Sequence, residues 1–224
     1  MTYRHPNNPN LTLTYESDYH GLPLLPKHGP YIESYLEKII ESIRRALDKH
    51  RRVTAIRFDL RIPSNCAEPD SQVITRFFES LKAKLASNQL RKARHGLRVH
   101  SCDLSYVWVK ERSTSHHRHY HCCILLNGDA YYHLGSFRPG VGGDQRQGNM
   151  AVRIRSAWAS ALGIHWEKAK GLVNFPPNRV YHLDANSETI IWQVGDLFQR
   201  LSYFAKADTK NYENSQKCFG CSRK

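Results

Sequence analysis

The stretch that most constrains the fold is residues 116–127, HHRHYHCCILLN, which sets two histidines two positions apart at the start of an apolar run. An apolar run of this length that ends at an Asn-Gly-Asp turn is typical of a buried β-strand. Alternate residues of a strand point to the same face of a sheet, so His119 and His121 are expected to lie side by side. Two neighbouring imidazoles can bind one divalent cation. The stretch therefore predicts a metal-ligand pair.

A third ligand is expected from the preceding strand. Residues 104–111, LSYVWVKE, read as a strand that a polar connection joins to the histidine strand, so the two form a hairpin. Glu111 ends its strand at the position that the hairpin places across from the histidines. Two imidazoles and one carboxylate suit Mg²⁺, Mn²⁺ or Zn²⁺ and leave positions open for substrate oxygens.

Each of these residues also has a simpler interpretation. A His-x-His pair on a strand is often a surface pair, and a chain with 13 histidines will sometimes contain one by chance. Glu111 alone would be a solvated charge at a strand end, and Cys122 and Cys123 read as small core residues. The metal site therefore gains its weight from a second element later in the chain.

Another strand is expected at residues 53–62, where apolar and polar residues alternate. Its polar face carries Arg57, Asp59 and Arg61. If that face borders the metal site, Asp59 is the rival to Glu111 as the third ligand, and the two arginines are candidate phosphate contacts. The alternative is a solvated polar face, which for the arginines is an equally good interpretation.

The spacing of apolar residues predicts four helices, at residues 31–50, 70–88, 149–162 and 187–210. Gly163 follows the third helix as a stop signal. Two short extended pieces, residues 172–175 and 179–183, are expected to supply an edge strand. Residues 1–30 show no sustained period and read as an irregular N-terminal arm.

The fourth helix carries the second candidate catalytic element. Its apolar stripe recurs at about 100 degrees per residue, and Tyr203 falls on the opposite side together with Lys206 and Lys210. Two ammonium groups beside the phenol would favour the phenolate and hold a nearby phosphate, so Tyr203 is the candidate nucleophile. Tyr212 is the second choice, because it lies beyond the predicted helix. Without the histidines, Tyr203 would be read as an ordinary surface tyrosine.

The charge of the chain favours a polyanionic partner. Thirty-three Lys and Arg against twenty Asp and Glu give a formal net charge of +13, which suits nucleic acid or a membrane surface. No apolar run is long enough for a transmembrane helix and the N-terminus lacks the apolar core of a secretory signal, so a cytoplasmic protein is expected. Six unevenly spaced cysteines favour reduced thiols. Cys218 and Cys221 form a lone CxxC, for which free thiols are expected rather than zinc.

These parts together resemble the HUH endonuclease superfamily of replication initiators and relaxases, which combine a His-hydrophobe-His strand with a helix carrying Tyr-x-x-Lys, here residues 203–206. Within it, the chain is similar to the YagK/YfjJ family of prophage proteins, which are related to the inovirus gene-two replication proteins. The resemblance covers about residues 52–223 and rests on the strings Asp59-Leu60-Arg61, Tyr106-Val107-Trp108-Val109-Lys110-Glu111, His119-Tyr120-His121, Ala157-Trp158, Ala161-Leu162-Gly163 and Phe219-Gly220-Cys221-Ser222.

The resemblance implies an α/β (α+β) fold of the ferredoxin-like kind, with a central antiparallel sheet and helices mainly on one face. We expect residues 1–30 to form an arm, residues 31–210 the nicking domain and residues 211–224 a basic tail. The implied activity is that of a rolling-circle replication initiator that nicks and rejoins single-stranded DNA.

The resemblance also implies a role for each candidate residue. Tyr203 would join the 5′ phosphate of the cut strand and release a 3′ hydroxyl, with Lys206 as base modulator or phosphate clamp. The two histidines and Glu111 would hold one Mg²⁺ or Mn²⁺. The expected DNA contacts are Arg57, Arg61 and Lys210.

The expected partner is single-stranded DNA or an origin hairpin, with host replication proteins as further candidates and no membrane. Two other functions stay open. A DNA-binding regulator on the same fold would bind origin DNA without cutting it. A metal-dependent hydrolase of RNA would produce free ends and never a protein-linked strand.

Overall fold

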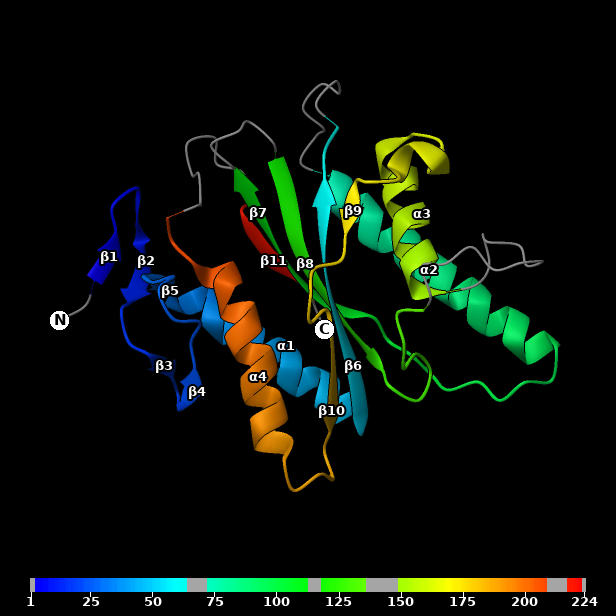
Figure 1. Cartoon of the computed structure of the whole chain (residues 1–224), viewed down its shortest axis with the longest axis horizontal. Coiled ribbons are helices and arrows are strands. Elements are labelled where there is room, and N and C mark those ends of the chain that lie inside the picture. The colour runs from blue at the N-terminus through cyan, green and yellow to red at the C-terminus, as the bar shows by residue number, and fades with distance from the viewer. Residues whose placement is uncertain (1–2, 64–71, 113–117, 136–148, 209–216, 223–224) are drawn as a thin grey trace.

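The computed structural model describes residues 3–63, 72–112, 118–135, 149–208 and 217–222. In chain order the elements are β1 (Tyr3–His5), β2 (Asn8–Thr14), β3 (Asp18–Tyr19), β4 (Leu22–Pro23), β5 (Tyr31–Ile32), α1 (Glu33–Lys49), β6 (Arg52–Arg61), α2 (Val73–Arg94), β7 (Ser105–Arg112), β8 (Arg118–Asn127), α3 (Met150–Leu162), η1 (Trp166–Ala169), β9 (Val173–Asn174), β10 (Val180–Asp184), α4 (Ile190–Ser202), η2 (Tyr203–Ala205) and β11 (Phe219–Cys221). The structure contains helices together with a central antiparallel sheet, which confirms the predicted α+β class (Figure 1).

The central sheet has six strands within the described residues. Its order is β10-β6-β8-β7-β11, and β9 pairs with β6 as well. Every pairing in it is antiparallel. The predicted hairpin of the histidine strand is present as β7 and β8, and the two extended pieces near residue 180 do form an edge of the sheet as β9 and β10.

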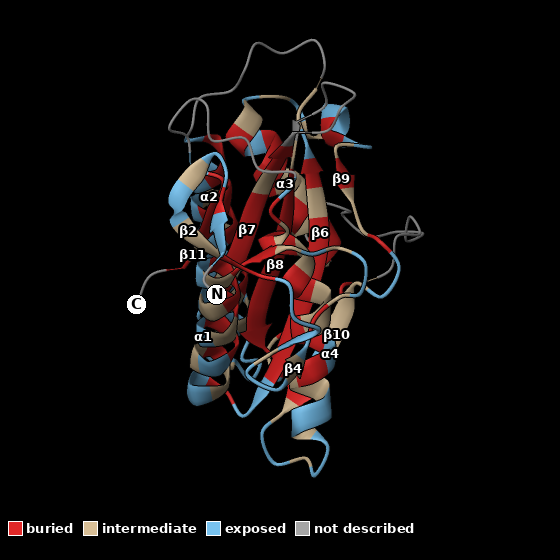
Figure 2. Cartoon of the chain, turned by 90° about the vertical axis from the view of Figure 1, so that its left-hand side faces the viewer, coloured by how far each residue is buried: buried red, intermediate tan, exposed pale blue. Residues whose placement is uncertain are grey.

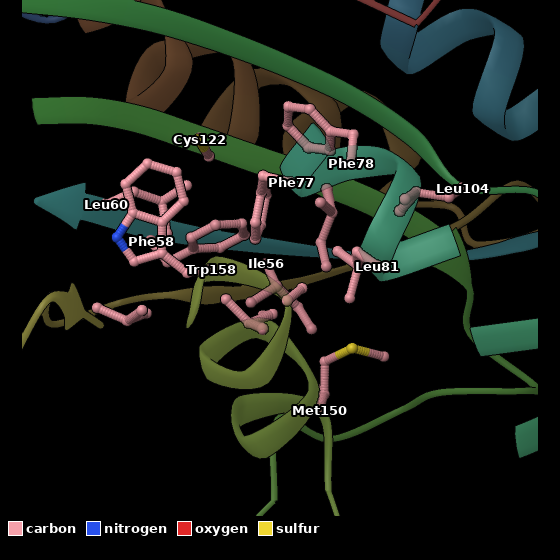
Figure 3. Close-up of a cluster of buried hydrophobic side chains, with 14 of the residues drawn as sticks. Ile56, Phe58, Leu60, Phe77, Phe78, Leu81, Leu104, Cys122, Met150 and Trp158 are labelled. Atoms are coloured by element: carbon pink, nitrogen blue, oxygen red, sulfur yellow. The ribbon is translucent and has the colours of Figure 1, made fainter. Parts of the chain in front are cut away.

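Helices cover both faces of this sheet, which corrects the expectation that they would lie mainly on one. On the first face, α2 and α3 pack around Phe58, Phe77 and Trp158 (Figure 3). On the second face, α1 and α4 enclose a separate core. The cause lies in β8, where Cys122 joins the first core and its neighbour Cys123 joins the second. A strand that is apolar on both faces needs a layer on each, and Figure 2 shows the resulting buried centre.

The boundaries of the first three helices follow the predicted ones, with one extension. α2 continues beyond the predicted residue 88 to Arg94, and the basic residues Arg91, Lys92 and Arg94 form its last turn, where cations interact favourably with the helix dipole. α3 begins at an Asn149 cap, whose side chain accepts a hydrogen bond from the Val152 N–H, and stops at Gly163 with φ 68°. No helix among the described residues has the length and apolar character that crossing a membrane requires.

The N-terminal arm is folded rather than irregular. β1, β2 and β5 form a small antiparallel sheet, and β3 pairs with β4. Leu13 and Leu24 are buried in the core shared with α1 and α4. The chain end also joins the fold, because β11, within the segment predicted as a basic tail, pairs with β7 and completes the sheet edge. Both termini therefore contribute to the second face.

The fourth helix is shorter than predicted. α4 ends at Ser202, and Tyr203 begins the 3₁₀ turn η2. The chain leaves the helical conformation at Lys206, because the N-terminal segment takes over its backbone hydrogen bonds. Lys206 forms a β-bridge with Tyr31, and the Ala207 N–H donates to the Pro30 carbonyl at 2.9 Å. Tyr203 and Lys206 thus lie on a tight turn and its exit, not on one helical face.

The close approach of β11 to β7 leaves no room for a side chain at Gly220. A Cβ there would lie 2.7 Å from three atoms of the Trp108 indole, the residue directly across the strand pair. Gly220→Ala is therefore expected to lower the free energy of unfolding by about 1–3 kcal/mol, as measured by urea denaturation. The penalty should shrink in a Trp108→Leu background, where the indole is gone. An equal penalty in both backgrounds would show that overpacking is not the cause.

Candidate metal centre

Strand register brings the predicted ligands together at one end of the sheet. Glu111 of β7 lies directly opposite His119 of β8. On the other side of β8, Asp59 of β6 lies directly opposite His121. Opposed residues of an antiparallel pair point to the same face, and here it is the face that bears α1 and α4, because Cys123 on the same strand face packs into that core. Neighbouring strands thus supply every polar group of the cluster.

Glu111, His119 and His121 form a group that could hold a metal ion. The His121 Nε2 atom lies 3.1 Å from Glu111 Oε2 and 3.1 Å from His119 Nε2, and the three candidate ligand atoms all lie within 4.8 Å of one another. Glu111 is only 4% exposed. Two imidazole nitrogens this close can share only one proton, so a cation bound between them and the buried carboxylate satisfies the lone pairs of all three. The donor set fits a divalent cation.

Asp59 lies on the far side of His121 from Glu111, so it is Glu111 that belongs to the group that could hold a metal ion. Its Oδ1 atom is 2.6 Å from His121 Nδ1, so the Nδ1–H donates to the carboxylate and Nε2 is left facing the cluster. Asn174 donates to the other carboxylate oxygen at 3.0 Å. A carboxylate in this position sets the tautomer and orientation of a ligating imidazole.

The electrostatics of the cluster agree with this arrangement. Burial raises the pKa of Asp59, but the hydrogen bond from His121 and the charge of Arg57 outweigh it and lower the pKa to about 2. Burial lowers the pKa of His121, while its hydrogen bonds to Asp59 and Glu111 outweigh the burial and raise it. The two carboxylates therefore favour the protonated form of His121 in the metal-free protein. A divalent cation would take over the role of that positive charge.

Replacing Asp59 with Asn is expected to lower Mn²⁺ affinity by about 10- to 100-fold, because the uncharged amide orients His121 less firmly. Isothermal titration calorimetry measures the change. Asp129→Asn is the matched control, since Asp129 pairs with Arg52 at 2.6 Å elsewhere in the chain, and should bind Mn²⁺ as the wild type does. An unchanged Mn²⁺ affinity in Asp59→Asn would contradict the proposal that Asp59 orients His121.

The two arginines of β6 have different surroundings. Arg57 is buried, with its Nη1 atom 3.4 Å from Asp59 Oδ1 and its guanidinium 5.9 Å from the centre of the Phe204 ring. This burial does not fit the prediction that Arg57 contacts DNA. Its charge supports Asp59 instead. Arg61 is exposed and lies directly opposite His119 across the strand pair, where a phosphate contact stays possible.

Tyr203 lies beside the cluster, although it does not lie on α4. The centre of its ring is 5.3 Å from that of His121, in an edge-on arrangement. Burial raises the pKa of Tyr203, Glu111 raises it further, and Arg57 offsets only part of the rise. In the described part of the chain, burial and the nearby carboxylates therefore act against the predicted phenolate.

Lys206 lies over the Tyr203 ring rather than at its hydroxyl, with Nζ 5.9 Å from the ring centre. A cation there interacts with the ring face and remains available to a phosphate bound beside the phenol. Lys210, the other predicted ammonium group, and Tyr212, the second-choice nucleophile, both lie outside the described residues.

Two residues near the cluster were not predicted from the sequence. His28, in the N-terminal segment, places its ring 5.4 Å from that of Tyr203, edge-on. Asn174 of β9 reaches Asp59. Neither is part of a motif, and each is more than 50 residues from its partner along the chain. Only the tertiary fold brings them in, so no sequence pattern could have identified them.

The two cysteines of β8 are core residues, as predicted. Cys122 and Cys123 are fully buried, one in each core, and burial raises the pKa of both thiols. Cys218 and Cys221 form no disulfide with described residues, and the group that could hold a metal in this part of the chain is the Glu-His-His cluster. The expectation of thiols rather than zinc at the CxxC motif stays a prediction.

The fold and the site define an α+β protein with a buried Glu-His-His cluster that could hold a metal ion and a half-buried tyrosine beside it. The chain belongs to the YagK/YfjJ C-terminal domain family, whose profile matches residues 14–222. Family membership confirms that part of the resemblance. The profile match begins at residue 14, whereas the resemblance read from the sequence began at about residue 52. The family region therefore includes most of the N-terminal arm, residues 1–30.

Two Escherichia coli (strain K12) proteins are similar to the chain over nearly their full length. It is 37% identical over 205 residues to "Uncharacterized protein YagK", which covers 88% of this chain and 95% of that protein. It is 33% identical over 228 residues to "Uncharacterized protein YfjJ", which covers 94% of this chain and 100% of that protein. No solved structure matched the chain.

Proposed function

We propose that this protein is a metal-dependent endonuclease of the HUH superfamily that nicks and rejoins single-stranded DNA. One observation carries the proposal. The Tyr203 ring lies edge-on to the ring of His121, with 5.3 Å between the ring centres, and His121 belongs to the Glu-His-His cluster that could hold a divalent cation. A nucleophile next to a site for a divalent cation is the arrangement that phosphodiester transesterification needs.

The reaction begins when the Tyr203 oxygen attacks a DNA phosphorus. The new tyrosine–phosphate bond replaces the bond to the 3′ oxygen, which leaves as a 3′ hydroxyl after taking up a proton. Glu111, a carboxylate close enough to the phenol to raise its pKa, would accept the phenolic proton. Bound at the cluster, Mg²⁺ or Mn²⁺ would supply Lewis-acid polarisation of the scissile phosphate. Because the phosphotyrosine keeps the energy of the broken bond, the strand can be rejoined.

The remaining residues position the strand. Arg61, exposed beside His119, would contact a phosphate flanking the cut, and Lys206 would clamp the phosphate beside the phenol. The net charge of +13 would hold the DNA backbone more generally. The partner is single-stranded DNA or an extruded origin hairpin. A released 3′ hydroxyl primes a polymerase, so the biological role is initiation of rolling-circle replication of a phage or prophage element in the cytoplasm, together with host replication proteins.

A labelled panel of single-stranded oligonucleotides and hairpins, incubated with the protein and Mn²⁺ and run on a denaturing gel, tests the proposal. A protein-linked band, together with a second product that a polymerase extends from its 3′ end, is the expected result. Cleavage without a protein-linked band would instead identify a hydrolase. Tight, specific binding of a hairpin without any cleavage would identify a non-cleaving regulator.

A further inference from the structure

A second candidate binding site lies on the other face of the sheet from the metal cluster. A groove of about 560 Å³ runs between α2 and α3 and reaches η1. These helices pack on the face away from α1 and α4 (Figure 1). The groove is lined by Ser80, Ala83, Lys84, Ser87, Asn88, Arg91, Arg153, Ser156 and Trp166. Its lining within the described residues holds three cations and three hydroxyls, with no carboxylate.

Two of the cations are held in place by a neutral group. Arg153 donates to the Asn88 side-chain oxygen at 2.7 Å, and Arg91 donates to the same oxygen at 3.3 Å. Asn88 is buried and donates in turn to the Tyr131 hydroxyl at 3.1 Å. An amide oxygen orients the guanidinium groups without cancelling their charge, whereas a carboxylate would neutralise it. Asn88 therefore holds Arg91 and Arg153 side by side without adding a negative charge of its own.

The pKa of Arg153 agrees with this picture. Burial lowers the pKa of Arg153 below its ordinary value; Tyr131 partly offsets this, and the neighbouring charge of Arg91 lowers the pKa further. Two cations that repel each other in a partly dry groove gain stability when an anion binds between them.

The spacing along α2 indicates a ligand with more than one phosphate. Ser80, Lys84, Ser87 and Arg91 recur at intervals of three or four residues, so they form one row along the groove. A helix rises 1.5 Å per residue, which separates Lys84 from Arg91 by about 10 Å along the axis. With both side chains extended away from the helix, two different phosphates are needed to contact them. A chain of phosphates can follow the row.

An aromatic side chain completes the groove. Trp166, at the start of η1, is half-buried in its wall. The Lys170 ammonium lies 5.9 Å from the centre of the Trp166 ring. Basic grooves that contain an aromatic platform are the usual form of a single-strand binding surface, because cations hold the backbone while a base stacks on the ring.

We propose that the α2–α3 groove binds a short segment of single-stranded nucleic acid, with its phosphates on Lys84, Arg91 and Arg153 and one base on Trp166. This site lies apart from the metal cluster and does not depend on any cleavage activity. In a nicking enzyme, it would hold a part of the strand distant from the cut.

Binding of a fluorescein-labelled dT8 oligonucleotide, followed by anisotropy over a series of salt concentrations, tests the row of cations. The full-length Tyr203→Phe protein is used throughout, so that no strand is cut and a failure of the proposed nicking reaction leaves the measurement unaffected. Lys84→Ala/Arg91→Ala should weaken binding about tenfold and reduce the salt slope by about 1.4, the loss of two contacts to a single strand. The charge-matched control Lys82→Ala/Arg94→Ala, on the same helix but outside the groove lining, should change the affinity less than twofold. An effect of the groove variant no larger than that of the control would overturn the proposal.

Photocrosslinking locates the bound strand. An oligonucleotide that contains 5-bromodeoxyuridine should crosslink to the peptide with Trp166, and Trp166→Ala should remove that crosslink. Trp192→Ala, at an exposed tryptophan on α4, should not remove it. Absence of any crosslink in the groove would contradict the assignment. Inorganic phosphate and dTMP serve as competitors, and displacement of dT8 by either at the same concentration as unlabelled dT8 would show a small-anion pocket rather than a strand site.

Discussion

Replacement of Tyr203 with Phe is expected to abolish the covalent protein–DNA adduct, with a loss of more than about a thousandfold in the rate of strand nicking. The substitution removes one oxygen atom and keeps the ring that packs edge-on against His121 and His28. The fold and the metal affinity should therefore be preserved. Quantification of protein-linked oligonucleotide on a denaturing gel, at fixed Mn²⁺, measures the loss, and circular dichroism checks the fold.

Tyr212→Phe is the matched control for this experiment, because Tyr212 is the second-choice nucleophile of the sequence. It should form the adduct at close to the wild-type rate. An adduct that persists in Tyr203→Phe and disappears in Tyr212→Phe would transfer the role of nucleophile to Tyr212. An adduct that survives both substitutions would refute the assignment of either tyrosine.

Replacement of His119 with Ala is expected to weaken Mn²⁺ binding by more than about a hundredfold, since it removes one of three donors from the cluster. His119 is the most exposed of the three, with 24% of its side chain accessible, so the change should cost little stability in the metal-free protein. Thermal unfolding gives the measurement. Mn²⁺ at a hundredfold excess over the wild-type dissociation constant should stabilise the wild type by about 2.7 kcal/mol, and the variant by no more than about 0.4 kcal/mol.

Two further variants separate metal binding from general effects of losing an imidazole. His121→Ala should also lose the Mn²⁺ stabilisation, but it leaves Glu111 and Asp59 facing each other without the intervening charge and should be less stable even without metal. His95→Ala, at an exposed position after α2, should keep the full stabilisation. Stabilisation of His119→Ala by Mn²⁺ equal to that of the wild type would place the cation elsewhere.

Local patterns in the sequence were enough to predict the histidine strand, the hairpin that opposes Glu111 to His119, and the beginnings of all four helices. These features depend on neighbours a few residues apart, whose side-chain period is visible in a single chain. The run CCILL in β8 also predicts where the helices pack. A strand that is apolar at every position is buried on both faces, which predicts helices on each side of the sheet.

The choice between Glu111 and Asp59 needed the tertiary structure. Both carboxylates lie on strands that flank β8 and both point to the cluster face, so alternation alone could not rank them. Their positions around His121 decide the matter, because one approaches Nε2 and the other approaches Nδ1. Which nitrogen faces which strand depends on the rotamer of one side chain, and packing around it sets that rotamer.

The sequence by itself determined the class of the fold, the strand that carries the two histidines and the presence of Tyr203 as a candidate partner for them. Only the tertiary structure decided where the helical conformation after α4 stops, because Pro30 and Tyr31 of a distant segment pair with the backbone at Lys206 and Ala207. The same segment brings His28 to Tyr203. Periodicity reports the interactions of a residue with its near neighbours in the chain. A segment more than 170 residues away can end a helix or complete a site, and no local pattern records it.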